Sequence, residues 1–148
     1  MLKIRIENSQ SRSKKHAYRA LALIVSNDGV VYEPRIVRSE QAKPMYAKGV
    51  AQYIYVEFKE SELLVYLRFV KNLRNEVKGY IEVLSSSGEK LLQVKYVDGK
   101  VRCVRGKRGY WKAIENVLTH LRIPYARVNL KTGICFERGH HSGLYSSD

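Results

Sequence analysis

The sequence predicts a single α+β domain in which two or three helices pack on an antiparallel β-sheet. A chain of 148 residues fits one compact domain and is long enough to bury a core. Its composition, 45% hydrophobic and 28% charged, is that of a folded globular protein. Stretches of alternating polarity, divided by Gly, Asp and Ser turns, are interspersed with stretches of helical spacing. We place the domain at residues 1–137 and a flexible tail at 138–148.

The elements are expected in the following order. Residues 2–7 alternate apolar and basic and predict a strand, 8–15 read as a loop, and 52–59 form an aromatic and β-branched strand. Residues 61–76 predict a helix, because Leu63, Leu67 and Val70 recur at helical spacing. The segments 79–84, 90–97 and 100–104 predict a meander. A second helix at 111–121 ends before Pro124, and a hairpin is expected from 125–129 and 133–137.

Residues 17–28 are compatible with two structures. In one, 22–26 and 30–33 are the strands of a hairpin, and Gly29 supplies the positive φ of its turn. In the other, Tyr18, Leu21 and Val25 lie on one face of a helix that ends at the Asp-Gly pair. Whether these residues form the hairpin or the helix bears on the function of the protein.

The segment from Leu21 to Gly29 resembles the nine-residue LAGLIDADG motif of a homing endonuclease family, with which Leu21, Ala22, Asp28 and Gly29 coincide. The resemblance extends over about residues 16–121 through the order of the following elements. It implies a helix at the motif, a homodimer and DNA cleavage that depends on a divalent metal such as Mg²⁺, held by Asp28 as catalytic and metal-binding residue. No other cofactor is expected.

Basic residues are concentrated in two segments. The chain has 27 Lys and Arg against 14 Asp and Glu, a net charge of +13. Residues 1–19 carry six basic groups and one acidic group, residues 100–131 carry nine and one, and residues 20–99 are nearly balanced. A localised positive field attracts a polyanion, and nucleic acid, DNA or RNA, is the leading partner.

The leading hypothesis is therefore a protein that binds the phosphate backbone with a basic N-terminal arm, residues 3–19, and a basic block at residues 100–131. The residues expected to contact phosphate are Arg12, Lys14, Lys15, Arg102, Arg105, Lys107, Arg108 and Lys112. Neutralising Arg105, Lys107 and Arg108 is expected to weaken binding more than neutralising Arg68, Lys71 and Arg74.

Three tyrosines are candidates for stacking on bases. Tyr53 and Tyr55 share one face of their strand, which is either exposed as a stacking platform or buried like the other face. Tyr110 lies beside two glycines in the basic block, whereas the neighbouring Trp111 fits the core face of the second helix.

Two further expectations concern cysteines and location. Cys103, Cys135, His140 and His141 could bind zinc, although the spacing matches no standard pattern, and the cysteines otherwise read as free thiols or one disulfide.

The sequence has no apolar run long enough for a membrane span, so we expect a cytoplasmic protein without a membrane partner, with homodimerisation left open. The alternative to nucleic-acid binding alone is the metal-dependent endonuclease or its inactive descendant.

Overall fold

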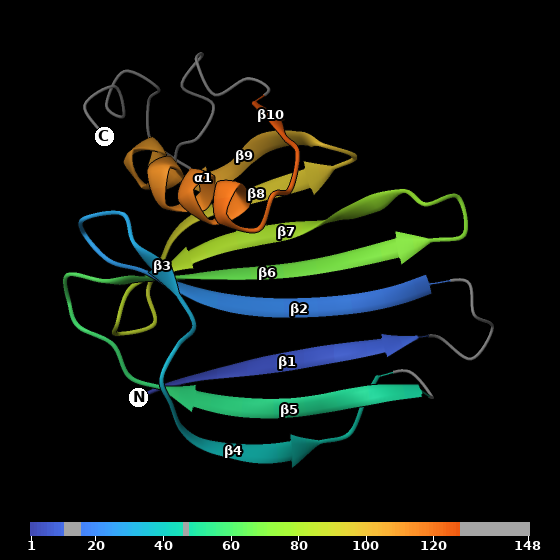
Figure 1. Ribbon diagram of the computed structural model, residues 1–148, viewed down its shortest axis with the longest axis horizontal. Helices are drawn as coiled ribbons and strands as arrows, with labels where there is room; N and C mark the ends of the chain where they lie inside the picture. Colours follow the sequence, from blue (N-terminus) through green and yellow to red (C-terminus); the bar gives the residue numbers. More distant parts are fainter. Residues whose placement is uncertain (11–15, 46–47, 128–148) are drawn as a thin grey trace.

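The computed structural model describes residues 1–10, 16–45 and 48–127. The strands are β1 (Leu2–Gln10), β2 (His16–Val25), β3 (Val31–Tyr32), β4 (Ile36–Ala42), β5 (Lys48–Val56), β6 (Leu63–Asn72), β7 (Val77–Leu84), β8 (Lys90–Val97), β9 (Lys100–Gly106) and β10 (Ala126–Arg127). A 3₁₀ turn (Arg108–Tyr110) leads into the helix α1 (Trp111–His120). The strands form one sheet in the order β10-β9-β8-β7-β6-β2-β1-β5-β4, with β3 paired to β2 (Figure 1). Only β10 runs parallel to its neighbour among the described strands.

The predicted fold class is wrong in its helix content. Strands account for 59% of the structure and helices for 11%, and the described residues contain one α-helix instead of two or three. The error lies at residues 61–76, where β6 replaces the predicted helix. Both faces of β6 are apolar in its first half, since Val65 and Leu67 enter one core cluster and Leu64 enters another. A strand that is buried on both faces also has apolar residues at helical spacing, so periodicity did not distinguish a helix from a strand in this segment.

Residues 17–28 form the hairpin. Val25 pairs with Val31 across β2 and β3, and Gly29 adopts φ 87° in the turn between them. The backbone N–H of Ser26 donates to Val30 O at 3.0 Å and closes the turn. The helix that the LAGLIDADG resemblance implies is therefore not formed by these residues.

The other predicted elements are present with altered limits. The meander corresponds to β7, β8 and β9, and the second helix corresponds to α1. β1 continues to Gln10, into the segment predicted as a loop, and β5 covers most of the strand expected at 52–59. Of the C-terminal hairpin, the described part is β10, whose partner is β9. The remainder of that hairpin and the tail at 138–148 lie outside the described residues.

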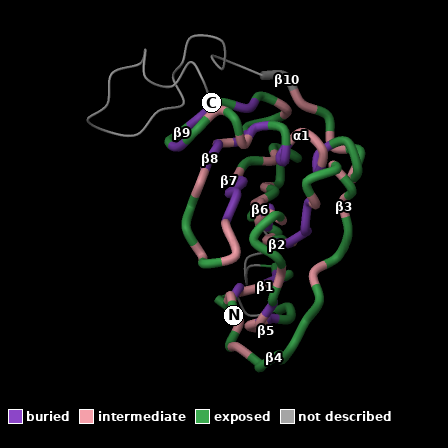
Figure 2. The backbone as a smooth tube through the Cα atoms, turned by 90° about the vertical axis from the view of Figure 1, so that its left-hand side faces the viewer, coloured by how far each residue is buried: buried purple, intermediate pink, exposed green. Residues whose placement is uncertain are grey.

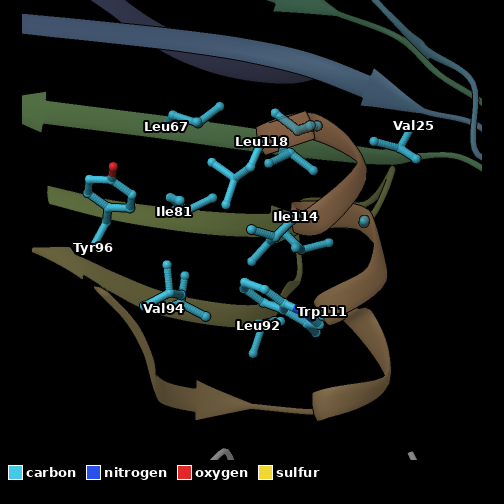
Figure 3. Close-up of a cluster of buried hydrophobic side chains, with 14 of the residues drawn as sticks. Val25, Leu67, Ile81, Leu92, Val94, Tyr96, Trp111, Ile114 and Leu118 are labelled. Atoms are coloured by element: carbon cyan, nitrogen blue, oxygen red, sulfur yellow. The ribbon is translucent and has the colours of Figure 1, made fainter. Parts of the chain in front are cut away.

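The main core lies between α1 and one face of the sheet. Trp111, Ile114 and Leu118 of α1 pack on Leu67, Ile81 and Val94 of the central strands, as Figure 3 shows. Viewed on edge, α1 and β3 lie on the same side of the sheet (Figure 2). Among the described residues, no helix has the length and apolarity needed to cross a membrane.

A second apolar cluster fills the space where β1 separates from β2. These two strands pair only at Asn8–Gln10 with Ala17–Arg19, and beyond that point they diverge. Ile4 and Ile54 of β1 and β5 pack there against Ile24 and Leu64 of β2 and β6. The turn from β7 to β8 reaches this cluster, because a Cβ built on Gly88 would lie 3.2 Å from Leu2 Cδ1. The cluster thus closes one end of the sheet face that α1 leaves uncovered.

Candidate nucleic-acid interface

Basic and aromatic side chains gather on the face of the sheet opposite α1, which we call the open face. Residues alternate between faces along a strand, and directly paired residues share a face. Val65 and Leu67 of β6 face α1, so Tyr66 and Arg68 belong to the open face. The pairing Arg68–Tyr80–Lys95–Arg102 carries this face across β6, β7, β8 and β9. The same register places Lys78, Lys100 and Arg105 there.

A groove of about 530 Å³ runs over the centre of the open face. Its floor includes Ala20, a small residue that pairs with Arg68 and lies among larger neighbours. Because Ala20 ends at Cβ, the surface is lower at β2 than at β1 and β6 on either side. The lining residues are Arg5, Glu7, Tyr18, Arg19, Ala20, Met45, Tyr66, Arg68, Phe69, Val70, Lys78, Gly79, Tyr80 and Lys95.

Acidic side chains at this surface are engaged by cations of the protein itself. Glu82 is 3% exposed, and its carboxylate lies 2.8 Å from Arg68 Nη2 and 3.0 Å from Lys90 Nζ. Glu7, also buried, lies 3.3 Å from Arg5 Nε and accepts a hydrogen bond from Met45 N at 2.8 Å. These pairs neutralise the carboxylates within the sheet, so they do little to repel an anionic ligand.

Several cations of the open face have no carboxylate partner within the described part of the chain. Lys78, Lys95 and Arg102 belong to this group, and none of them takes part in a salt bridge there. Lys78 and Arg102 are exposed, whereas Lys95 is half-buried in the groove wall. The open face therefore carries a positive charge that its own acids do not balance.

A second group of tyrosines lies next to the groove on β5. Lys3 Nζ is 4.3 Å from the ring centre of Tyr53, and the guanidinium of Arg38 is 4.1 Å from that of Tyr55. Arg5 donates to Tyr53 Oη at 3.0 Å, and this hydrogen bond raises the pKa of the guanidinium above its ordinary value. Tyr53 and Tyr55 are half-buried, with cations over their rings. They differ from Tyr80, which is 39% exposed and has no such cation among the described residues.

The structure distributes the residues predicted from the sequence over both sides of the sheet. Arg102 and Arg105 are on the open face, with Tyr53 and Tyr55 beside its groove. Lys107 lies in the turn before α1, followed by Arg108 in the 3₁₀ turn. The remaining predicted residues lie elsewhere: Tyr110 packs against the core on the α1 side, Lys112 lies 3.7 Å from Glu115 on the helix surface, and Arg12, Lys14 and Lys15 lie outside the described residues.

The sequence did not single out the residues at the centre of the groove. Arg68 lies in the groove. The expectation that neutralising Arg105, Lys107 and Arg108 weakens binding more than neutralising Arg68, Lys71 and Arg74 stays a prediction. Lys78, Tyr80 and Lys95 were also not identified from the sequence. Residues 20–99 are nearly neutral as a whole, and a charge count does not show that these side chains lie on one face of the sheet. The available signal was the alternation along β7 and β8, where Lys78, Tyr80 and Lys95 occupy positions opposite to Ile81 and Val94.

Asp28 has a local role in the β2–β3 turn. Its side chain is exposed and accepts hydrogen bonds from Ser26 Oγ and, at 3.3 Å, from Val30 N. The hydrogen bond from Ser26 is the main cause that lowers the pKa of Asp28 below its ordinary value, and Val30 adds to it. The described residues contain no group of three or more His, Cys, Asp or Glu suited to a metal ion. Asp28 is thus a turn-stabilising residue, without neighbouring ligands among them for a two-metal site.

Of the four candidate zinc ligands, one lies within the described residues. Cys103 is buried on β9 and is disulfide-bonded, so it is not the free thiol that one reading of the sequence expected. A disulfide sulfur does not offer the thiolate that zinc binds. Cys135, His140 and His141 lie outside the described residues.

Comparison with known proteins gives no relative. No family model matches the chain, and neither a curated protein nor a solved structure does.

Proposed function

We propose that this protein binds single-stranded nucleic acid on the open face of its sheet. The observation that carries the proposal is the segregation of cations and an exposed tyrosine on that face, where the buried acids are already paired. Lysine and arginine bind phosphates without regard to sequence, and an aromatic ring accepts the face of any base. Phosphates would contact Lys78, Lys95 and Arg102, and a base would stack on Tyr80.

Two features favour a single strand over a duplex. A duplex keeps its bases stacked inside and presents mainly phosphates and groove edges to a protein. A single strand exposes its base faces, which an open sheet with aromatic side chains can contact directly. The groove beside Tyr80 lies between charged walls, so base and backbone can be contacted together.

The proposal is tested by fluorescence anisotropy with a labelled ten-nucleotide single strand, as DNA and as RNA, and with a duplex of the same length. The protein is compared with Lys78→Gln/Lys95→Gln/Arg102→Gln, which removes the three cations of the open face that would contact phosphates. Each phosphate contact on a single strand contributes about 0.7 to the slope of log affinity against log salt. Loss of three contacts therefore lowers the slope by about 2, which corresponds to about a hundredfold weaker binding at 0.1 M salt.

The matched control is Lys48→Gln/Lys59→Gln/Lys71→Gln, which makes the same change in net charge at positions away from the open face. It is expected to retain most of the affinity. Equal losses in the two triple variants would show that net charge, not the open face, governs binding. A salt-independent affinity, or tighter binding of the duplex, would contradict the proposal itself.

A further inference from the structure

The positive charge of the open face forms a row at right angles to the strands. Direct pairing aligns Arg68, Tyr80, Lys95 and Arg102 on four consecutive strands. Ala20 of β2, the groove floor, continues the row beyond Arg68. We call these five residues the cross-strand row. Strands in a sheet are about 4.8 Å apart, so the row spans roughly 14 Å from Arg68 to Arg102 and roughly 19 Å from Ala20.

Neither β6 nor β7 offers a comparable path along its own length, and β9, which carries Lys100, Arg102 and Arg105 on this face, does not line the groove. On the open face of β7, Lys78 and Tyr80 are followed by the buried Glu82 and then by Leu84. On β6, Arg68 is flanked by Val70 on one side and, beyond Tyr66, by Leu64 on the other. A phosphate chain that followed either strand would leave the cations within two or three residues and reach the apolar cluster that contains Leu84 and Leu64.

One end of the open face is also closed to a ligand that follows the strands. The apolar cluster with Ile24 and Leu64 occupies that end, and the turn at Gly88 reaches across to Leu2. The cross-strand row lies away from this cluster, in the part of the face that contains the groove. Both the charge pattern and the shape therefore favour a path across the strands.

We infer, building on the proposed function, that a single strand crosses β9, β8, β7 and β6 along the cross-strand row, enters the groove toward Arg5, and occupies about four nucleotides. The number of nucleotides follows from the distance between neighbouring strands of the sheet. An unstacked strand advances per nucleotide by roughly twice the 3.4 Å rise of a stacked one. From Arg102 to Ala20 the path crosses four strand spacings, roughly 19 Å, and Arg5 lies beyond Ala20 on the part of β1 that diverges from β2. Arg68 and Lys95, on either side of Tyr80, would hold the phosphates that flank the base stacked on its ring.

Glu82 gives one of these phosphate contacts a fixed position. Its buried carboxylate accepts a hydrogen bond from Arg68 Nη2 at 2.8 Å, while the Arg68 side chain remains 47% exposed. An arginine has five N–H donors, so the remaining ones can contact a phosphate. Glu82 is thus a positioning residue for Arg68.

The first test is a length series of single strands from two to ten nucleotides, measured with the unaltered protein by anisotropy at fixed salt. Affinity and salt slope are expected to rise steeply up to about four or five nucleotides and then level off, apart from the statistical gain of additional registers. A plateau at two nucleotides, or a continued rise to ten, would overturn the path while leaving the proposed function intact. Absence of binding at every length would refute both.

The second test addresses the base contact. Tyr80→Leu is expected to weaken binding of a five-nucleotide strand about tenfold, the effect of one lost stacked base. Tyr32→Leu is a matched control, because Tyr32 is 38% exposed but lies on β3, away from the row. An abasic strand of equal length is expected to bind Tyr80→Leu and the unaltered protein equally. Equal affinity of the two proteins for the five-nucleotide strand with bases would remove Tyr80 from the path.

Discussion

Replacement of Glu82 by glutamine is expected to lower the free energy of unfolding by about 2 kcal/mol. The substitution preserves the shape of the side chain but removes its charge. Glu82 is 3% exposed and lies 2.8 Å from Arg68 and 3.0 Å from Lys90, so one carboxylate serves two cations. The glutamine oxygen can accept from one of them, and its amide group then presents N–H donors to the other.

The magnitude follows from the exposure of the partners. A hydrogen bond to a charged group contributes about 1.5 to 3 kcal/mol, and a pair in water contributes much less. The side chains of Arg68 and Lys90 are 47% and 50% exposed, so solvent screens both interactions and the lower values apply. For a domain of this size, a loss of about 2 kcal/mol lowers Tm by about 4 to 8 °C.

Urea unfolding followed by circular dichroism measures the change, with Tm from a thermal scan as a second value. Glu57→Gln is the control, because Glu57 is exposed and forms no salt bridge among the described residues. It is expected to change the free energy of unfolding by less than about 0.5 kcal/mol. If Glu82→Gln proves as stable as Glu57→Gln, the carboxylate does not anchor the two cations and the reasoning is refuted.

The remaining predictions concern the helix and alkaline pH. Ile114→Ala is expected to cost about 3 kcal/mol of unfolding free energy, because Ile114 is 0% exposed between α1 and the sheet; Thr119→Ala on the exposed side of α1 is the control, and equal urea midpoints would contradict this packing. Burial raises the pKa of Tyr66 above its ordinary value, so its contribution to stability is complete below about pH 10 and is lost as pH rises through the raised pKa. Tyr66→Phe is expected to unfold with a weaker dependence on pH between about 9 and 11; identical dependences in the two proteins would show that Tyr66 does not titrate with unfolding.

The strands with one polar face were predictable from the sequence. Along β8, Leu92, Val94 and Tyr96 alternate with Gln93 and Lys95, and only a strand of period two places such residues on separate faces. The turn at Asp98-Gly99 and the helix α1 were equally accessible, because positive-φ turns and amphipathic helices depend on local chemistry.

β6 could not be assigned in this way. Its residues Leu64, Val65 and Leu67 are all fully buried, since one face packs under α1 and the other fills the gap beside β1. The second of these contacts depends on the divergence of β1 from β2, which involves strands distant in sequence from β6. Local periodicity contains no information about such a contact.

The sequence by itself determined a folded single chain with a basic excess, a hairpin or helix at 17–28, and a meander that ends in a helix. Only the tertiary structure decided where the charged side chains lie relative to one another. Arg68 and Arg102 are 34 positions apart in the sequence, yet strand pairing brings them to one row with Tyr80 and Lys95 between them. Alternation indicates that side chains share a face of a strand, but the neighbours across that face are set by the order and register of the strands.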